Sequence, residues 1–302
     1  MSATSIPPGF TAAPALPDVL PPAPVRSRVG HLIHRHPTFV LGASLLLVMI
    51  FIAIFAPYLG TVDPTALAPA KRTRPPSELY WFGTDMLGRD VYSRVLYGAR
   101  VSLIVGFGVA LASAVIGVLI GVISGFVRWL DSVIMRVMDG LMSIPGILLA
   151  IALMALTRGS VSNVIIAITI PQVPQVARLI RSVVLSLREQ PYVEAAIASG
   201  TRLPKIIFRH ILPNTMAPLT VQATYICASA MITEAILSFL GAGTPPTIPS
   251  WGNIMAEGRA LWQVKPYIVF FPAAFLSVTV LAVNLMGDGL RDALDPRLAK
   301  RL

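Results

Sequence analysis

The sequence predicts an all-α integral membrane protein with six transmembrane helices. Its 302 residues have a mean hydropathy of +0.74 and are only 13% charged, far below the roughly 25% of soluble domains. Six apolar runs are long enough to cross roughly 30 Å of hydrocarbon. These predicted spans are 38–57, 101–127, 133–156, 161–182, 217–240 and 267–286.

The chain begins with a tail, predicted over residues 1–36, that is rich in proline and then basic. The first 25 residues contain seven prolines and no apolar run, so they cannot supply the core of a signal peptide. We expect them to be disordered and cytoplasmic. The basic group RSRVGHLIHRHP then leads into the first span, which should remain as an anchor.

The net charge of +10 indicates topology rather than nucleic acid binding, because the basic residues cluster beside apolar spans. With the amino terminus inside, 15 of the 24 basic residues fall on the cytoplasmic side. Both termini are then cytoplasmic, and 58–100 and 241–266 are external. We expect Trp251 and Trp262 in the second external segment to be interfacial belt residues or part of an outer gate.

The second and later spans carry features that favour close packing or a polar path. Small residues recur every four positions in the second span, so another helix of this chain or of a partner subunit can approach closely. They are Ser113, Gly117, Gly121 and Gly125. Prolines and polar side chains in other spans are candidates for lining a translocation path or for hydrogen bonding between helices. These path candidates are Pro145, Gln172, Gln175, Glu234 and Asn284.

The sequence excludes several enzyme classes. A phosphate-binding loop of the form G-x-x-x-x-G-K-[ST] is missing, because no lysine follows a glycine. Three of the four histidines, His31, His34 and His36, lie in the basic flank of the first span without a carboxylate or cysteine at zinc spacing. No G-x-S-x-G motif occurs. We therefore predict no catalytic residues, no metal site and no cofactor in this chain.

The stretch EAAIASGTRLPKIIFRHILPN, from Glu194 to Asn214, interrupts the apolar spans and is predicted to be a docking element. A small-residue helix ends at Gly200, which suits a left-handed helix end. A second helix over 203–211 places Leu203, Ile206, Ile207, His210 and Ile211 on one face. Arg202, Lys205 and Arg209 lie on the opposite face, and Phe208 lies between the two faces. An amphipathic loop lying along the membrane surface is the alternative.

This stretch resembles the EAA loop of ABC importer permeases, E-A-A, three residues, G, nine residues, then I-x-L-P. His210 departs from the pattern, where isoleucine is expected. Three more stretches resemble the C-type permease subunit of dipeptide, oligopeptide and nickel importers. They are FGTDMLGRDVYSRVLYGARVSL, LSFLGAGTPPTIPSWG and NLMGDGLRDALDPRL.

The resemblance implies a type I ABC importer permease fold with an extra N-terminal helix. It divides the chain into a first helix and periplasmic segment at 37–99, a core at 100–288 with its EAA loop at 188–214, and a cytoplasmic tail at 289–302. It implies ATPase contact by the EAA loop. The residues implied are Glu194, Ala195, Ala196, Gly200, Arg202, Lys205, Phe208 and Arg209.

The resemblance also implies a bacterial cytoplasmic membrane location and a set of partners. These are a B-type permease, two ATPase subunits that bind ATP and Mg, a periplasmic or lipoprotein solute-binding protein, and membrane lipid. Peptides are the expected substrates, with nickel chelates, glutathione or another small solute as alternatives. A secondary transporter is the alternative of a different class, although the spans hold few charges and no evident repeat.

Overall fold

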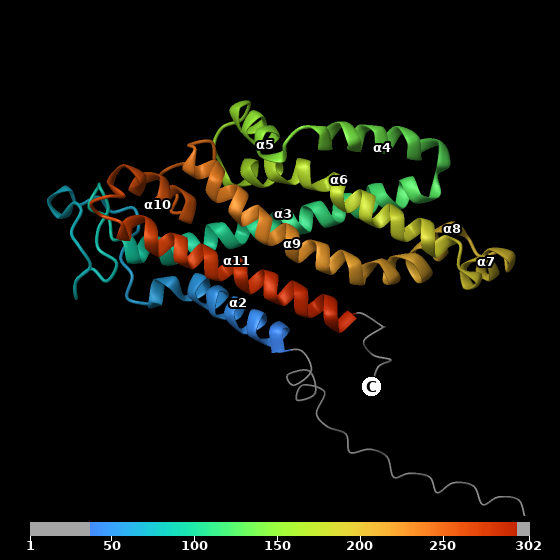
Figure 1. Ribbon diagram of the computed structural model, residues 1–302, viewed down its shortest axis with the longest axis horizontal. Coiled ribbons are helices and arrows are strands. Elements are labelled where there is room, and N and C mark those ends of the chain that lie inside the picture. The colour runs from blue at the N-terminus through green and yellow to red at the C-terminus, as the bar shows by residue number, and fades with distance from the viewer. Residues whose placement is uncertain (1–36, 295–302) are drawn as a thin grey trace, which may run out of the picture. The chain divides into compact units, whose positions relative to one another are not determined.

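The computed structural model describes residues 37–294, and every regular element within them is helical (Figure 1). Five helices are long and apolar enough to cross a membrane, or six if one sharply bent pair forms a single span. This confirms the all-α class. The five long helices are α2 (Pro37–Phe55), α3 (Val91–Phe126), α6 (Val161–Arg188), α9 (Leu212–Phe239) and α11 (Tyr267–Leu294).

Shorter elements connect the long helices. They are η1 (Ala56–Tyr58), η2 (Pro69–Lys71), α4 (Arg128–Ser143), α5 (Gly146–Ala155), α7 (Pro191–Ala198), α8 (Leu203–Ile206), the π-helical turn η3 (Ile207–Ile211), α10 (Trp251–Gly258) and η4 (Arg259–Leu261). The predicted tail at 1–36 lies outside the described residues. The predicted tail at 289–302 begins as helix, because α11 continues to Leu294.

The third predicted span, 133–156, is wrong as a single helix. The structure divides it into α4 and α5, which meet at an angle of 87°. Pro145 has no amide hydrogen, and a proline disfavours helical geometry in the residue before it. Ile144 is accordingly extended, with φ −92° and ψ 127°. Pro171 and Pro174, by contrast, lie within the continuous helix α6.

Helix α3 begins at Val91, well before the predicted residue 101, because a side chain caps it. Asp90 accepts a hydrogen bond from the Ser93 amide at 2.9 Å, which satisfies one of the free amides of the first turn. The helix packs mainly against α6 and α9, and Figure 1 shows it in the middle of the long helices.

The small residues of α3 face α6 of the same chain, so the first of the two predicted packing alternatives is confirmed. A Cβ atom at Gly117 would lie 2.5 Å from the Cβ of Val176, and one at Gly121 would lie 2.7 Å from the carbonyl oxygen of Ala177. Both distances are far shorter than van der Waals contact. These glycines therefore set the separation of the two helices.

We predict that Gly121→Ala lowers the stability of the folded protein by about 1–3 kcal/mol, because the added methyl group overpacks the α3–α6 interface. Gly140→Ala on α4 is the matched control, since its Cβ would meet no atom within 4 Å. Alanine should stabilise that helix by up to about 1 kcal/mol. Thermal unfolding of the detergent-purified protein measures both effects, and equal midpoints would contradict the packing argument.

Candidate functional site

The predicted docking element occupies one end of the described structure, where α7 and α8 connect α6 to α9 (Figure 1). Helix α7 has Pro191 in its first turn, where the missing amide hydrogen costs nothing. At its other end, Gly200 adopts φ +75°. The Thr201 amide donates to the Ala196 carbonyl at 3.0 Å, and the Gly200 amide donates to the Ile197 carbonyl at 2.9 Å.

These two hydrogen bonds form a Schellman motif, in which a residue in the left-handed conformation ends a helix. The predicted left-handed conformation of Gly200 is confirmed. A Cβ atom at Gly200 would meet no atom within 4 Å. The turn therefore needs glycine for its backbone angle and leaves open space in front of it.

Helix α7 is held by one apolar residue and exposes most of its surface. Val193 is fully buried, whereas Glu194 and Ala195 are exposed and Ala196 is partly buried. A short helix with this pattern is anchored on one side and presents small side chains on the other. Another surface can approach such side chains closely.

The second helix of the docking element differs from the prediction in its end. It does not stop at residue 211, because α8 continues through the π-helical turn η3 into α9. The amide of Leu212 donates to the carbonyl of Ile207, five residues earlier. This wider turn lies just before Pro213, whose ring would clash with the preceding turn of an ordinary α-helix.

The two predicted faces of this helix are largely observed. Ile206 and Ile211 are buried, whereas Leu203, predicted on the same face, is 48% exposed. The cations Arg202, Lys205 and Arg209 are exposed, as predicted for the opposite face. Phe208 is 70% exposed. An exposed aromatic ring beside cations is suited to insertion into a pocket on another protein.

His210, the departure from the family pattern, packs against α7. Its ring centroid lies 5.9 Å from that of Tyr192, and its carbonyl accepts a hydrogen bond from the Asn214 side chain at 2.6 Å. The histidine therefore connects the π-helical turn to the start of α7. Sequence reasoning found no role for it, because the contact crosses the Gly200 turn.

The docking element is also tied to the long helices behind it. The Arg188 guanidinium donates to the Gly125 carbonyl at 3.0 Å, which joins the ends of α6 and α3. A cavity of about 410 Å³ lies between these ends and α8, lined by Phe126, Arg188, Ile197, Thr201, Leu203 and Ile206. Residues of the docking element therefore lie around the same cavity as the ends of α3 and α6.

The five predicted path residues do not form one cluster. Pro145 is exposed at the α4–α5 break, Gln175 is exposed on α6, and Asn284 is exposed on α11. The Gln172 side-chain oxygen is buried without a hydrogen-bond partner in the described structure. Glu234 is fully buried and accepts a hydrogen bond from the Ser238 hydroxyl at 2.8 Å.

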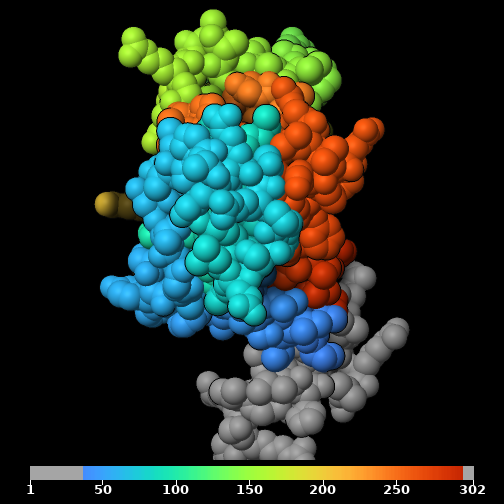
Figure 2. Space-filling view, turned by 90° about the vertical axis from the view of Figure 1, so that its left-hand side faces the viewer, coloured from blue at the N-terminus to red at the C-terminus, as the bar shows by residue number. Residues whose placement is uncertain are grey.

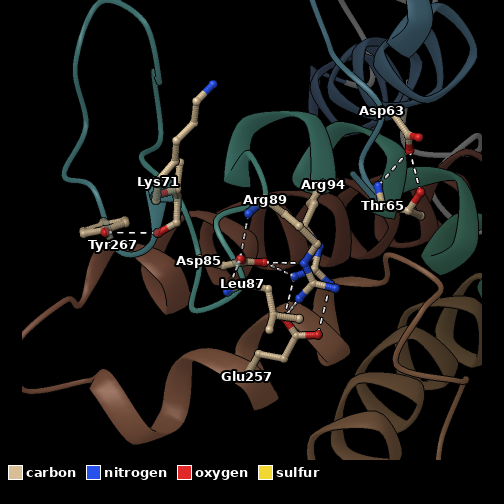
Figure 3. A network of polar contacts seen from close by, with 10 residues as sticks. Asp63, Thr65, Lys71, Asp85, Leu87, Arg89, Arg94, Glu257 and Tyr267 are labelled. Atoms are coloured by element: carbon tan, nitrogen blue, oxygen red, sulfur yellow. Dashed lines mark hydrogen bonds and ion pairs between the residues drawn. The ribbon is translucent and has the colours of Figure 1, made fainter. Parts of the chain in front are cut away.

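At the opposite end, the structure contains an ion network that sequence reasoning missed (Figure 3). The Arg94 guanidinium pairs with Asp85 at 2.6 Å and also with Glu257. Arg89 pairs with Asp85 at 2.7 Å and also with Glu257. Asp85 and Arg94 are at most 1% exposed. The network thus joins the segment before α3, α3 itself and α10.

Segments 58–100 and 241–266 therefore meet at this end of the chain. In Figure 2 this end faces the viewer, and residues between α2 and α3, in cyan, cover much of it beside the orange segment that follows α9. Trp251 is fully buried, and its indole donates to the Val95 carbonyl at 3.0 Å. The belt interpretation is wrong for Trp251, whereas Trp262 is 53% exposed.

Within residues 37–294, no group of three or more His, Cys, Asp or Glu side chains could hold a metal ion. The docking element presents small, basic and aromatic side chains. The opposite end presents a rigid surface built on the ion network.

Comparisons with known protein families give two matches. Residues 117–300 match the family model of the binding-protein-dependent transport system inner membrane component. Residues 31–76 match the N-terminal TM domain of oligopeptide transport permease C. The second match contains α2, as expected for an extra N-terminal helix.

Individual relatives match over most of their length. The chain is 55% identical to a probable peptide ABC transporter permease protein of Sinorhizobium fredii, over 88% of this chain and 91% of the relative. It is 39% identical to the oligopeptide transport system permease protein of Bacillus subtilis, over 86% of each chain. It is also 39% identical to a glutathione transport system permease protein of Pectobacterium atrosepticum, over 94% of this chain and 95% of the relative.

The fold resembles a chain of the MetNI methionine ABC transporter, solved in inward-facing conformations. The TM-score is 0.54 with 20% identity, and the match covers 67% of this chain and 96% of the other. At this sequence identity the match supports the fold alone.

Proposed function

This chain belongs to the family of binding-protein-dependent transport system inner membrane components, and we propose that it is the C-type subunit of a peptide importer. As a member of this family it is an integral inner-membrane permease of an ABC importer and a transport subunit rather than an enzyme. A secondary transporter does not fit this family.

Peptides are the proposed substrates because relatives that are 55% and 47% identical to this chain are named as peptide permeases. Relatives named for glutathione, such as that of Pectobacterium atrosepticum, make glutathione the alternative. Nickel chelates, the other alternative from the sequence, are named for none of the relatives described above. The uptake experiment below separates these three substrate classes.

The docking element is the observation that carries the proposed mechanism. Its exposed Phe208, the Schellman turn at Gly200 and the surrounding cations support contact with an ATPase subunit. ATP and Mg would bind to two such partner subunits. Closure of the ATPase pair would shift the permease between inward-open and outward-open states. The shift requires that the contacts between the permease and the ATPase subunits differ between the two states.

The remaining partners follow from the same arrangement. A B-type permease would complete the translocation path as a heterodimer with this chain. With both termini cytoplasmic, the docking element would face the cytoplasm, and segments 58–100 and 241–266 would face a solute-binding protein outside. Membrane lipid would surround the exposed apolar faces.

The proposed function is tested with the complete importer reconstituted in liposomes. We expect uptake of labelled dipeptides or oligopeptides that needs ATP and the binding protein and that persists when ionophores collapse ion gradients. Uptake of glutathione or of nickel chelates in place of peptides would replace the substrate assignment. Failure of ATPase subunits to co-purify with this chain would contradict the docking assignment.

We predict that Phe208→Ala weakens ATPase binding tenfold or more, because a central aromatic anchor at an interface typically contributes about 2 kcal/mol or more. Glu194→Ala should cost less than about 1 kcal/mol if its contact is exposed at the rim. Leu79→Ala, at the opposite end, is the control, since Leu79 is 75% exposed. Co-purification of ATPase subunits at graded concentrations measures all three, and equal retention would contradict the prediction.

A further inference from the structure

A small cavity opens between α9 and α11, which lie side by side in Figure 1 and are packed together. Its volume is about 180 Å³. Its lining contains no charged side chain and is divided between apolar and hydrogen-bonding residues. The residues are Tyr225, Ala228, Ser229, Ile232, Thr233 and Asn284.

The polar residues of this cavity share one face. Tyr225, Ser229 and Thr233 recur every four positions on α9, so they lie one above another, and Asn284 reaches the cavity from α11. The Thr233 hydroxyl donates to the Ser229 carbonyl at 2.8 Å. Among the described residues, the hydroxyls of Tyr225 and Ser229 and the Asn284 amide make no hydrogen bond within the chain.

These free polar groups are difficult to reconcile with a lipid-facing surface. In hydrocarbon, each unsatisfied polar group costs several kcal/mol. Helix α2 shows what a lipid-facing surface of this chain looks like, since its exposed residues Leu41, Leu47 and Phe51 are apolar. Tyr225 is equally exposed, at 60%, yet it carries a hydroxyl. The cavity should therefore face water or a polar ligand.

We propose that this cavity is a contact site for the peptide backbone in the translocation path. The inference rests on the proposed function and adds a location and a chemistry to it. A peptide amide needs a donor for its carbonyl and an acceptor for its N–H. Hydroxyl groups and a carboxamide supply both, so Tyr225, Ser229 and Asn284 can serve any peptide.

The absence of charge from the cavity lining has a consequence for specificity. A charged wall would attract peptides of one sign and repel those of the other. Neutral donors and acceptors can hydrogen-bond to the peptide backbone, which is the same in every peptide. Asn284, one of the five predicted path residues, thereby acquires a specific role, whereas Glu234 is fully buried and lies outside the cavity lining.

Cysteine labelling tests whether the cavity is open to water. Ser229→Cys and Asn284→Cys are made in the complete importer in membrane vesicles and treated with a hydrophilic methanethiosulfonate reagent. The natural Cys227 is only 2% exposed, so the unmodified chain gives the background. Leu111→Cys on α3, where Leu111 is 68% exposed, is the matched control. We expect labelling of the cavity positions at least tenfold faster than at the control.

Equal labelling at Ser229→Cys and Leu111→Cys would overturn the proposal, because the cavity would then face lipid or a partner subunit. This result would not contradict the proposed function, because the proposed function is tested separately by peptide uptake in the wild-type importer. Conversely, an importer that does not transport peptides would fail the uptake test even if the cavity were labelled.

Uptake with altered cavity chemistry tests whether the substrate touches the site. Asn284→Leu should lower the apparent affinity for all peptides about fivefold, the loss typical of one neutral hydrogen bond. Asn284→Asp should favour lysine-containing over glutamate-containing peptides several-fold, because the new carboxylate attracts one and repels the other. An identical change for both peptides with Asn284→Asp would show that the substrate does not touch this cavity.

Discussion

Replacing Arg94 with methionine is expected to destabilise the chain by about 3–5 kcal/mol, the typical cost of removing one partner from a buried ion pair. Arg94 is the central cation of the network that joins the start of α3 to α10, and it is 1% exposed. Its loss would leave Asp85 with Arg89 alone, and Glu257 would lose two of its contacts. Methionine fills a similar volume, so the effect reports charge rather than a cavity.

The measurement is thermal unfolding of the purified protein together with its amount in the membrane. Arg72→Met is the matched control, because Arg72 lies in the same segment, 58–100, and is exposed. The double variant Arg94→Met with Asp85→Asn should recover part of the loss, since one uncompensated charge is gone. A melting temperature unchanged from wild type for Arg94→Met would contradict the assigned role of the network.

The network also connects distant segments of the chain. Arg94 and Glu257 are 163 residues apart in the sequence, and their pairing holds α10 to the start of α3. Asp85 further receives amide hydrogen bonds from Leu87 and Arg89 at 2.8 and 2.9 Å, which fixes the turn before α3. The ion network thus connects segments 58–100 and 241–266 to each other and to the start of α3.

The sequence predicted those parts of the molecule that depend on local patterns. Apolar runs gave the long helices, and the order of small, apolar and basic residues gave the docking element, including the left-handed Gly200. Such features need only neighbours in the chain. The small-residue face of α3 was also correctly identified, although its partner α6 could only be named by the structure.

Features that depend on distant contacts escaped prediction. Hydropathy averaged over residues 133–156 concealed that α4 carries charges on one face. Asp131 of α4 forms a bidentate pair with Arg181 of α6, with one contact at 2.6 Å, and Asp139 pairs with Arg178 at 2.6 Å. Both pairs join α4 to α6, and the partner of each α4 charge cannot be identified from composition.

The burial of Trp251 also depends on a contact between residues that are distant in the sequence. A tryptophan near the end of a span commonly lies in the interfacial belt, and nothing local distinguishes this one. Its indole N–H donates a hydrogen bond to the carbonyl of Val95, 156 residues away in the sequence. Gly98, which has no side chain, leaves room beside the ring. Contacts of this kind explain why 58–100 and 241–266 were predicted as two separate segments and not as segments that pack together.

The second large effect is expected at the docking element, where Gly200→Asp should lower peptide uptake tenfold or more while leaving the folded chain intact. The backbone at Gly200 has φ +75°, and aspartate is among the residues that tolerate this region best, at a cost of roughly 1–2 kcal/mol. Apart from the two neighbouring residues in the chain, no atom of the described residues lies within 4 Å of the added Cβ. The chain itself therefore accommodates the substitution, and any large effect must come from a partner that approaches the turn.

Gly60→Asp is the matched control for this prediction. Gly60 has φ +71° and likewise no atom within 4 Å of a Cβ, but it lies between α2 and α3 at the opposite end. Both variants carry the same charge and the same backbone strain, so they should have equal melting temperatures. ATPase activity of the complete importer, measured with and without binding protein and peptide, should lose its stimulation only in Gly200→Asp.

The comparison of the two glycines separates coupling from folding. If Gly200→Asp and Gly60→Asp reduced uptake equally, the loss would reflect backbone strain or membrane insertion, and the Gly200 turn would not be an ATPase contact. If Gly200→Asp alone abolished stimulation while ATPase subunits still co-purified, the turn would transmit closure without providing the main attachment. Phe208 would then carry the affinity and Gly200 the close approach, a division that the exposed ring and the open turn already favour.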